Sequence, residues 1–368
     1  MHRCGLTPPA GGANLGALSP APRPAPYRIH ALTIAAATLG GGVLHLLHVP
    51  LAWMIGAMMA TAALAWSRPV AVPAAFRPAG LLFLGLALGS TFSGPVLAAV
   101  TAALPVMLLC GLLAILSGLV VARLFTRLAG TDAKTGFFCA VPGGVIVMAM
   151  LAQEAKASVA TVTLAQTMRV LVVVLTFPPL LGWLAPHGDF SDFTAARSPV
   201  WWPGLLGMAA VALVVAMPLR RLGIANPWMI GACALGILLA ATGNLPSGVP
   251  GWLVDAAQVA MGASLGTRLT RSFLLSSRRL AIASVISAAV LSLLLTVLAV
   301  GIGAMAGLPM AAMILGMAPG GMPEMALTAK ALELGVPLVL GFHLTRTVMS
   351  NLLVGPIHRL AVSLRLLA

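Results

Sequence analysis

The sequence predicts an all-α integral membrane protein of about ten transmembrane helices, arranged as two inverted repeats. The first observation behind this prediction is the composition, because 60% of the 368 residues are hydrophobic and only 8% are charged. Soluble domains carry roughly 25% charged residues. So few charges cannot cover a water-facing surface, and most of the surface must therefore face lipid.

The second observation is a series of apolar runs near the length that spans a bilayer, about 20 residues each. Residues 1–28 are rich in Pro, Ala and Gly and are expected to form a disordered tail. The apolar segments of the first half are 31–48, 50–67, 79–98, 102–124, 135–153 and 159–184. Those of the second half are 200–219, 226–243, 252–270, 280–305, 308–329 and 336–357.

The third observation is an internal duplication, in which three motifs recur at a nearly constant spacing. Trp-Met-Ile-Gly-Ala occurs at 53–57 and 228–232, GLALGSTF at 85–92 matches GASLGTRL at 262–269, and Pro-Gly-Gly occurs at 142–144 and 319–321. The spacing is 177 residues at Pro-Gly-Gly (319 − 142) and 175 at Trp-Met-Ile-Gly-Ala (228 − 53). We therefore expect membrane repeats at 29–184 and 200–368, joined by a loop at 185–199.

The basic residues predict that the repeats lie oppositely in the membrane. The clusters are Arg68 and Arg77, then Arg123, Arg127 and Lys134, in the first half, and Arg220 and Arg221, then Arg268, Arg271, Arg278 and Arg279, in the second. They follow the second and fourth segments of the first half but the first and third of the second half. Cytoplasmic loops collect Lys and Arg, so the halves should be inverted. Both termini are then cytoplasmic, in the inner (plasma) membrane.

An inverted arrangement requires an odd number of crossings per half, so one segment of each half should not cross fully. Glycine and proline break helices, and broken backbone survives in lipid only where protein or water satisfies it. We therefore expect the Pro-Gly-Gly segments to be broken or re-entrant elements. Their residues are Pro142, Gly143, Gly144, Pro319, Gly320 and Gly321.

These motifs resemble the AbrB membrane family, whose domain is duplicated and whose members are often labelled ammonia monooxygenases or AbrB regulators. The resemblance covers about 29–360 and is most specific at APGGMPEMALTAKALE, residues 318–333. The first half departs from that string, with Val147 where the second half has Glu324. The resemblance implies a role in regulating gene expression. It does not extend to the soluble AbrB-type DNA-binding fold.

Two arginines, Arg169 and Arg346, lie near the middle of their apolar segments. A charge at the bilayer centre costs about 2.5–3.5 kcal/mol on insertion scales. Gln166 and His343 each precede an arginine by three residues and so share its helix face. The arginines either bind an anionic solute or bond the carbonyls of the neighbouring broken element, and the two roles are compatible. Ser350 and Asn351 extend the second of these faces.

Glu324 follows the second Pro-Gly-Gly and is expected in the first turn of the next helix, where the helix dipole favours a carboxylate. It is either a capping residue or a proton-carrying group that couples transport. The helix N-termini after both Pro-Gly-Gly elements would present free N–H groups to an anion.

Weaker polar signals have ordinary interpretations. We interpret His45 and His48 as interfacial or packed histidines, Asn226 as a helix cap, and Asp255 and Gln258 as solvated residues at a span boundary.

The sequence disfavours several function classes. The net charge of +14 fits the positive-inside rule, and no basic run interleaved with aromatics predicts direct nucleic-acid binding. The seven histidines form no HxxxH or HExxH set, and the four cysteines show no CxxC spacing. We therefore expect no enzyme activity, cofactor or metal site. The expected partners are the lipid bilayer and a small solute, with a homo-oligomer left open.

The preferred function is secondary transport of a small, anionic solute, bound at the repeat interface near the bilayer midplane. Arg169, Arg346, Gln166 and His343 would bind the solute, Glu324 would couple transport, and the Pro-Gly-Gly elements would be the gates. Arg346→Ala should then abolish uptake in a folded protein. The alternative is a membrane-embedded regulator of gene expression that acts through a protein partner, as the family resemblance implies.

Overall fold

The computed structural model describes residues 26–184, 198–224, 226–271 and 278–364, and these residues form 15 helices and no strand. In the first half the helices are α1 (Pro26–Leu46), α2 (Ala52–Ala65), α3 (Phe76–Gly89), α4 (Gly94–Ala102), α5 (Leu104–Ala129), α6 (Ala133–Ala140), α7 (Val145–Glu154) and α8 (Val159–Leu184). In the second half they are α9 (Trp202–Arg221), α10 (Pro227–Ala241), α11 (Gly251–Gly266), α13 (Arg278–Ala306), α14 (Met310–Met317), α15 (Met322–Ala331) and α16 (Val336–Ser363).

Six of these helices (α1, α5, α8, α9, α13 and α16) are long and apolar enough to cross a membrane. The multi-pass, all-helical membrane class is therefore confirmed. The bent pair α3 and α4 gives a seventh candidate span, so the structure has fewer full-length spans than the sequence predicts. The difference arises because α2, α10 and α11 have only 14, 15 and 16 residues. At 1.5 Å per residue they are shorter than the roughly 30 Å hydrocarbon core.

Three predicted boundaries differ from the structure or fall outside it. Segment 79–98, expected as one helix, is α3 and α4 with a 92° bend between them. The reason is a helix start at Gly94-Pro95, since proline favours the first turn of a new helix. The predicted tail 1–28 is helical from Pro26, and its earlier residues lie outside the described part of the chain. Most of loop 185–199 also lies outside it.

The recurring motifs explain how the two halves hold together. The Trp-Met-Ile-Gly-Ala helices pack crosswise, α2 against α11 and α10 against α3. At each crossing a glycine of the third segment meets a backbone carbonyl: a Cβ on Gly262 would overlap the Met54 oxygen, and one on Gly85 would lie 2.5 Å from the Met229 oxygen. The halves are therefore joined by two matching close helix crossings, as small-xxx-small patterns allow.

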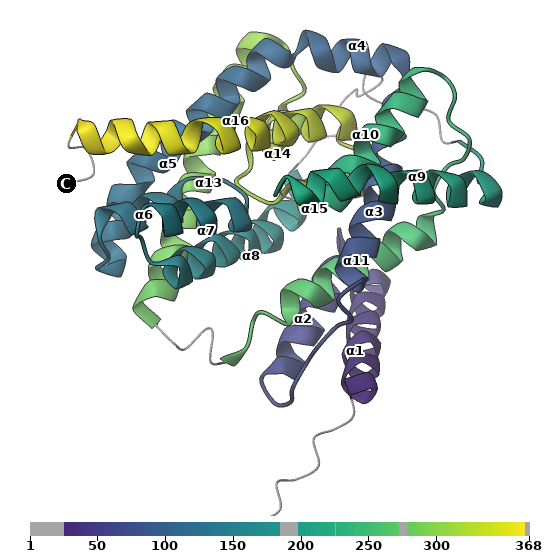
Figure 1. Cartoon of the computed structure of the whole chain (residues 1–368), viewed down its shortest axis with the longest axis horizontal. Helices are drawn as coiled ribbons and strands as arrows, with labels where there is room; N and C mark the ends of the chain where they lie inside the picture. Colours follow the sequence, from purple (N-terminus) through teal and green to yellow (C-terminus); the bar gives the residue numbers. More distant parts are fainter. Residues whose placement is uncertain (1–25, 185–197, 225, 272–277, 365–368) are drawn as a thin grey trace, which may run out of the picture.

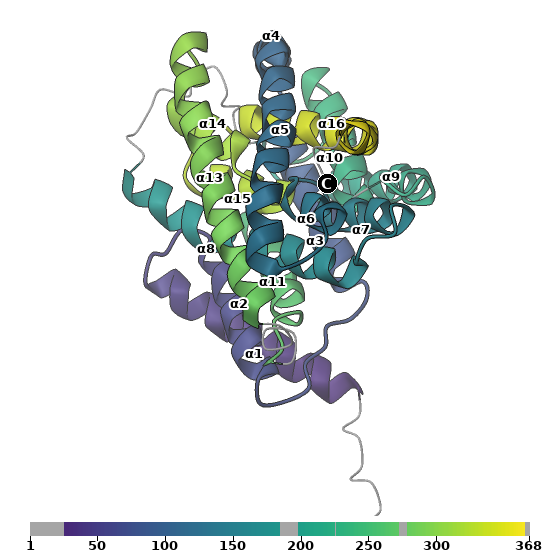
Figure 2. The ribbon, with the colours of Figure 1, turned by 90° about the vertical axis from the view of Figure 1, so that its left-hand side faces the viewer.

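The equivalent helices α5 and α13 run antiparallel side by side, whereas α2 and α11, which are not equivalent, end beside each other. Arg279, at the start of α13, donates to the carbonyls of Leu128 (2.8 Å) and Arg127 (3.4 Å) at the end of α5, and Figure 2 shows the two helices adjacent. Trp66, just after α2, donates to the carbonyl of Leu269, just after α11. These contacts bring basic clusters from both halves to one end of the molecule.

The principal helix contacts fall into two groups. One group consists of α1, α2, α3, α9, α10 and α11, and the other of α5 to α8 and α13 to α16. Figure 1 shows the first group below and to the right of the second. Between the groups the contacts are few: α3 contacts α15 and α16, and the connecting helix α4 contacts α10 and α16. The two larger cavities described below lie along this boundary.

Candidate functional site

Each Pro-Gly-Gly motif lies between two short helices, so the chain leaves the helical conformation there. The last carbonyls of a helix have no partner within it. In this protein the arginines of the long last helices satisfy them. Arg346 donates to the carbonyls of Ala318 (2.6 Å) and Gly320 (2.8 Å), and Arg169 donates to those of Val141 (3.2 Å) and Gly143 (3.1 Å).

The residues three positions earlier do the same. Gln166 donates to the carbonyls of Phe138 (2.7 Å) and Val141 (3.0 Å). His343 Nε2 lies 3.1 Å from the Leu315 carbonyl, and its Nδ1 lies 2.8 Å from Arg346 Nη2. The carbonyl needs a donor and the guanidinium an acceptor, so the partners assign His343 to its neutral Nε2–H tautomer.

The two clusters are related by the duplication. The arginines, their first carbonyls and their second carbonyls are each 177 residues apart (346 − 169, 318 − 141 and 320 − 143). The structure thus contains the arrangement in which each arginine bonds its neighbouring broken element. Positive charge at a helix C-terminus also complements the helix dipole. One role of Arg169 and Arg346 is therefore to donate hydrogen bonds to the backbone carbonyls of the two helix breaks.

Ser350 and Asn351 differ in their surroundings. Ser350 Oγ is buried and donates to the Pro142 carbonyl at 3.0 Å, which ties α16 of the second half to the break of the first. Asn351 is exposed on α16 and does not share this buried cluster.

A cavity of about 160 Å³ lies where the two breaks meet the group of α3, α10 and α11; we call it the central cavity. Of the predicted site residues, it is lined by Arg169, Glu324, Gly143, Gly144, Gly320 and Gly321. Gln166, His343, Arg346, Ser350 and Asn351 do not line it. The predicted set therefore divides into residues that face this space and residues that support the breaks.

Two helix N-termini point into the central cavity. Val145 and Ile146 begin α7, and Pro323 and Glu324 lie in the first turn of α15; all four residues line the cavity. The N-cap residues are Gly144 and Gly321, which have no side chain to bond the first amides. Free amides at a helix start, with the positive end of the dipole, favour an anion.

A buried methionine packs against each break. A Cβ on Gly320 would lie 2.9 Å from the Met325 sulfur, and one on Gly143 would lie 3.0 Å from the Met148 sulfur. This contact explains why both halves place a methionine five residues after the first glycine.

Glu324 is the acidic residue of the central cavity. Its side chain is 2% exposed, and its Oε2 has no hydrogen-bond partner within the described residues. The carboxylate turns back over Gly321 in the first turn of α15, where the dipole stabilises negative charge. Arg77 and Arg268 lie close enough to interact with it electrostatically.

Four polar residues of the cavity lining were not predicted as site residues. Arg77 of α3 and Arg268, just after α11, were assigned to cytoplasmic clusters, yet both line the central cavity. Asn226 stands at the N-cap of α10, as expected, but its side chain makes no capping bond and also lines the cavity. Thr167 completes the set. Only the crossing of the two halves brings these residues together, so no local sequence signal marked them.

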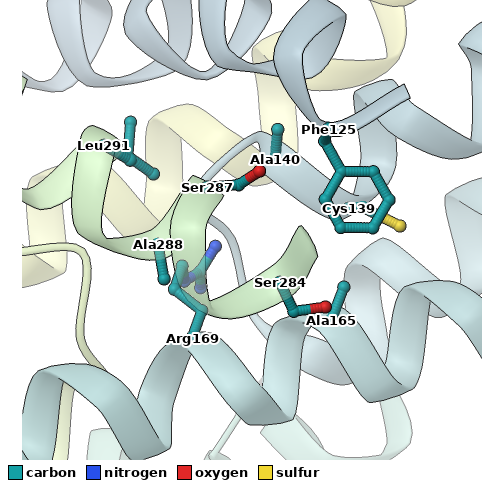
Figure 3. Close-up of a pocket in the computed structure, with 9 residues that line it drawn as sticks. All are labelled: Phe125, Cys139, Ala140, Ala165, Arg169, Ser284, Ser287, Ala288 and Leu291. Carbon is teal, nitrogen blue, oxygen red and sulfur yellow. The ribbon is translucent and has the colours of Figure 1, made fainter. Parts of the chain in front are cut away.

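A second, much smaller space of about 10 Å³ lies on the other side of Arg169, between α8 and α13. Figure 3 shows Arg169 facing the α13 residues that line this space, Ser284, Ser287, Ala288 and Leu291. Arg169 Nε and Ser287 Oγ are buried there, and neither has a hydrogen-bond partner in the part of the chain that the structure describes. The space has the size of a single water molecule, to which both atoms could bond.

Metal ligation has no evident site in the described ranges. Within residues 26–184, 198–224, 226–271 and 278–364, no three His, Cys, Asp or Glu side chains gather closely enough to hold a metal ion.

Comparison with known proteins gives the family. The family described as "Transition state regulatory protein AbrB" matches residues 53–361. The chain is 30% identical to the uncharacterized protein YhjN of Bacillus subtilis, over 89% of this chain and 91% of that protein. It is 24% identical to the "Putative regulator AbrB" of Escherichia coli, over 84% of this chain and 89% of that protein. With most of its length matched by that family, the chain belongs to the AbrB family of membrane proteins.

Proposed function

We propose that the protein is a secondary transporter of a small anionic solute, which binds in the central cavity. The observation that carries this proposal is the cavity lining: two helix N-termini, three arginines (Arg77, Arg169 and Arg268) and one acidic residue, Glu324. Three cations against one carboxylate leave a formal charge of +2 facing the space. An anion is the ligand that this lining would stabilise.

The inverted-repeat topology belongs to the same proposal. The antiparallel run of the equivalent helices α5 and α13 supports it, as does the gathering of basic clusters at one end. By the positive-inside rule that end is cytoplasmic. The termini would then be cytoplasmic, the protein would lie in the inner membrane, and the central cavity, with Arg77 and Arg268, would open toward the cytoplasm.

Arg77→Gln is expected to weaken anion binding while leaving the fold intact. Arg77 Nη1 has no hydrogen-bond partner among the described residues, so the substitution leaves no acceptor of that atom unpaired. It does remove one of the two positive charges near Glu324, and Arg268 remains. A hydrogen bond to a charged group contributes about 1.5–3 kcal/mol, which corresponds to roughly tenfold to hundredfold weaker binding. The measurement is a thermal-shift titration of purified protein with small anions, since a ligand raises the stability of the state it binds.

Arg68→Gln is the matched control for this experiment. Arg68 is exposed at the same end of the molecule and does not line the cavity, so anion binding should be unchanged. If both variants bind the anion with the same affinity, Arg77 does not contribute to anion binding. If no anion shifts the wild-type protein, the transporter proposal loses its support.

Gly321→Ala is expected to reduce uptake at little cost in stability. The new methyl group would overlap Glu324 Oε2 and lie 3.0 Å from Glu324 Cδ. The tip of a flexible side chain can swing away, so the carboxylate is displaced while the backbone is kept. Gly207→Ala is the control, because nothing lies within 4 Å of a Cβ there. Uptake into proteoliposomes and the melting temperature should be measured together. Full uptake by the Gly321 variant would exclude Glu324 as the coupling group.

The alternative, a membrane-embedded regulator of gene expression, draws on the name of the Escherichia coli relative. It predicts a protein partner that co-purifies with the wild-type chain, together with no thermal shift by any small anion.

A further inference from the structure

A second chamber, of about 550 Å³, lies toward the opposite end of α11 from the central cavity. Asp255 and Gln258 of α11 line the second chamber, whereas Leu265 and Arg268 line the central cavity. From Asp255 to Leu265 the helix rises about 15 Å. The second chamber is also lined by His45, His48 and Lys330. These residues come from separate parts of the sequence. On sequence grounds the histidines are interfacial or packed residues and Asp255 and Gln258 are boundary residues, so the sequence does not predict that they share a site.

Helix α15 contacts both spaces. Pro323 and Glu324 at its start line the central cavity, and Leu327 and Lys330 farther along line the second chamber. Glu324 and Leu327 are three residues apart, or about 4.5 Å along the helix axis. About one turn of α15 therefore stands between the two cavities.

The surroundings of α15 suit a movable barrier. The two cavities lie on the boundary between the two helix groups, where α15 and α16 meet α3. Residues Met322–Ala329 are all buried, and α15 contacts α8, α14 and α16 of its own group and α3 of the other group. The helix follows Gly320 and Gly321 and is followed by Glu333 and Gly335, which both have positive φ. Its ends are thus set by residues outside regular helical conformation.

We infer that the second chamber is the entrance for the same anionic solute from the opposite side of the membrane, and that α15 is the barrier between the two entrances. This inference rests on the proposed function. Lys330 and Asp255 both line the chamber and lie close enough to interact electrostatically, so their formal charges balance. The Asp255 carboxylate also accepts a hydrogen bond of 3.1 Å from Gln258 Nε2, and an anion entering the chamber would compete with this carboxylate for Lys330. A solute would pass from Lys330 to Glu324 when the helix groups shift against each other across α15.

Single cysteines that line each cavity test this inference without any solute. In a Cys4→Ser background the other three cysteines are buried. Ala331→Cys and His48→Cys report on the second chamber, and Asn226→Cys and Val145→Cys report on the central cavity. Each variant is treated with a membrane-impermeant maleimide in intact cells and in inside-out vesicles. Two probes per cavity keep the test valid if one variant fails to fold.

The expected result is labelling of the two pairs from opposite sides of the membrane. Labelling of both pairs from the same side would overturn the inference, as would a folded chamber variant that is labelled from neither side. Because the labelling experiment uses no anion, it can give the expected result even if no anion shifts the melting temperature. Conversely, an anion can shift the melting temperature even if the labelling pattern contradicts the inference. The two failures are therefore distinguishable.

Discussion

Replacing Gly262 with leucine is expected to abolish the folded protein. A Cβ at this position would overlap the Met54 carbonyl oxygen and would lie 3.0 Å from Ala57 Cβ. The obstacle is mainly backbone, so the side chain fits only if α2 and α11 separate. A single extra methylene in a packed core already costs about 1–3 kcal/mol, and leucine adds several carbons. Gly85→Leu should behave alike, because its Cβ would lie 2.5 Å from the Met229 oxygen.

The measurement is the yield of monodisperse protein in size-exclusion chromatography, followed by the melting temperature. Gly301→Leu is the control, since Gly301 lies exposed on α13 with nothing within 4 Å of a Cβ. There leucine should be neutral or favourable, because glycine inside a helix costs about 1 kcal/mol. Gly262→Ala should be intermediate. Equal yields of the Gly262 and Gly301 leucine variants would mean that the crossing does not hold the two halves together.

The sequence predicted the membrane class, and the chain leaves the helical conformation at the two Pro-Gly-Gly motifs, because both features follow from local chemistry. Apolar composition excludes a water-facing surface, and Pro-Gly-Gly cannot continue a helix. The break between α3 and α4 was missed because the whole of 79–98 reads as apolar. Its signal was present in Ser93-Gly94-Pro95, which is a typical helix start.

The lining of the central cavity was only partly predictable. The three-residue spacing paired Gln166 with Arg169, and His343 with Arg346, because such residues share a helix face, and in the structure each pair faces the same helix break. The spacing could not say whether that face meets a solute or a carbonyl, since both need the same donors. Arg77 and Arg268 were missed for a different reason. The positive-inside rule already accounted for them, and only the crossing of the two halves brings them to one cavity.

Arg346→Ala is expected to destabilise the protein strongly, in contrast to the sequence-based expectation of a folded but inactive variant. The substitution removes the donors to the carbonyls of Ala318 and Gly320, at 2.6 and 2.8 Å, and the partner of His343 Nδ1. A buried polar group left without a partner costs about 1–3 kcal/mol. Leaving these two carbonyls unpaired should lower the free energy of unfolding by about 2–6 kcal/mol. This is a large part of the free energy of unfolding of a typical protein.

Arg346→Lys keeps the charge but not the planar fork that reaches both carbonyls, so its melting temperature should lie between those of Arg346→Ala and the wild type. Arg359→Ala is the control on the same helix, because Arg359 is exposed. A melting temperature of Arg346→Ala equal to that of Arg359→Ala would show that the carbonyl bonds contribute little. If the expected loss occurs, failed uptake by Arg346→Ala says nothing about solute contact. Evidence for the anion must then come from Arg77, whose guanidinium reaches the cavity without holding a break together.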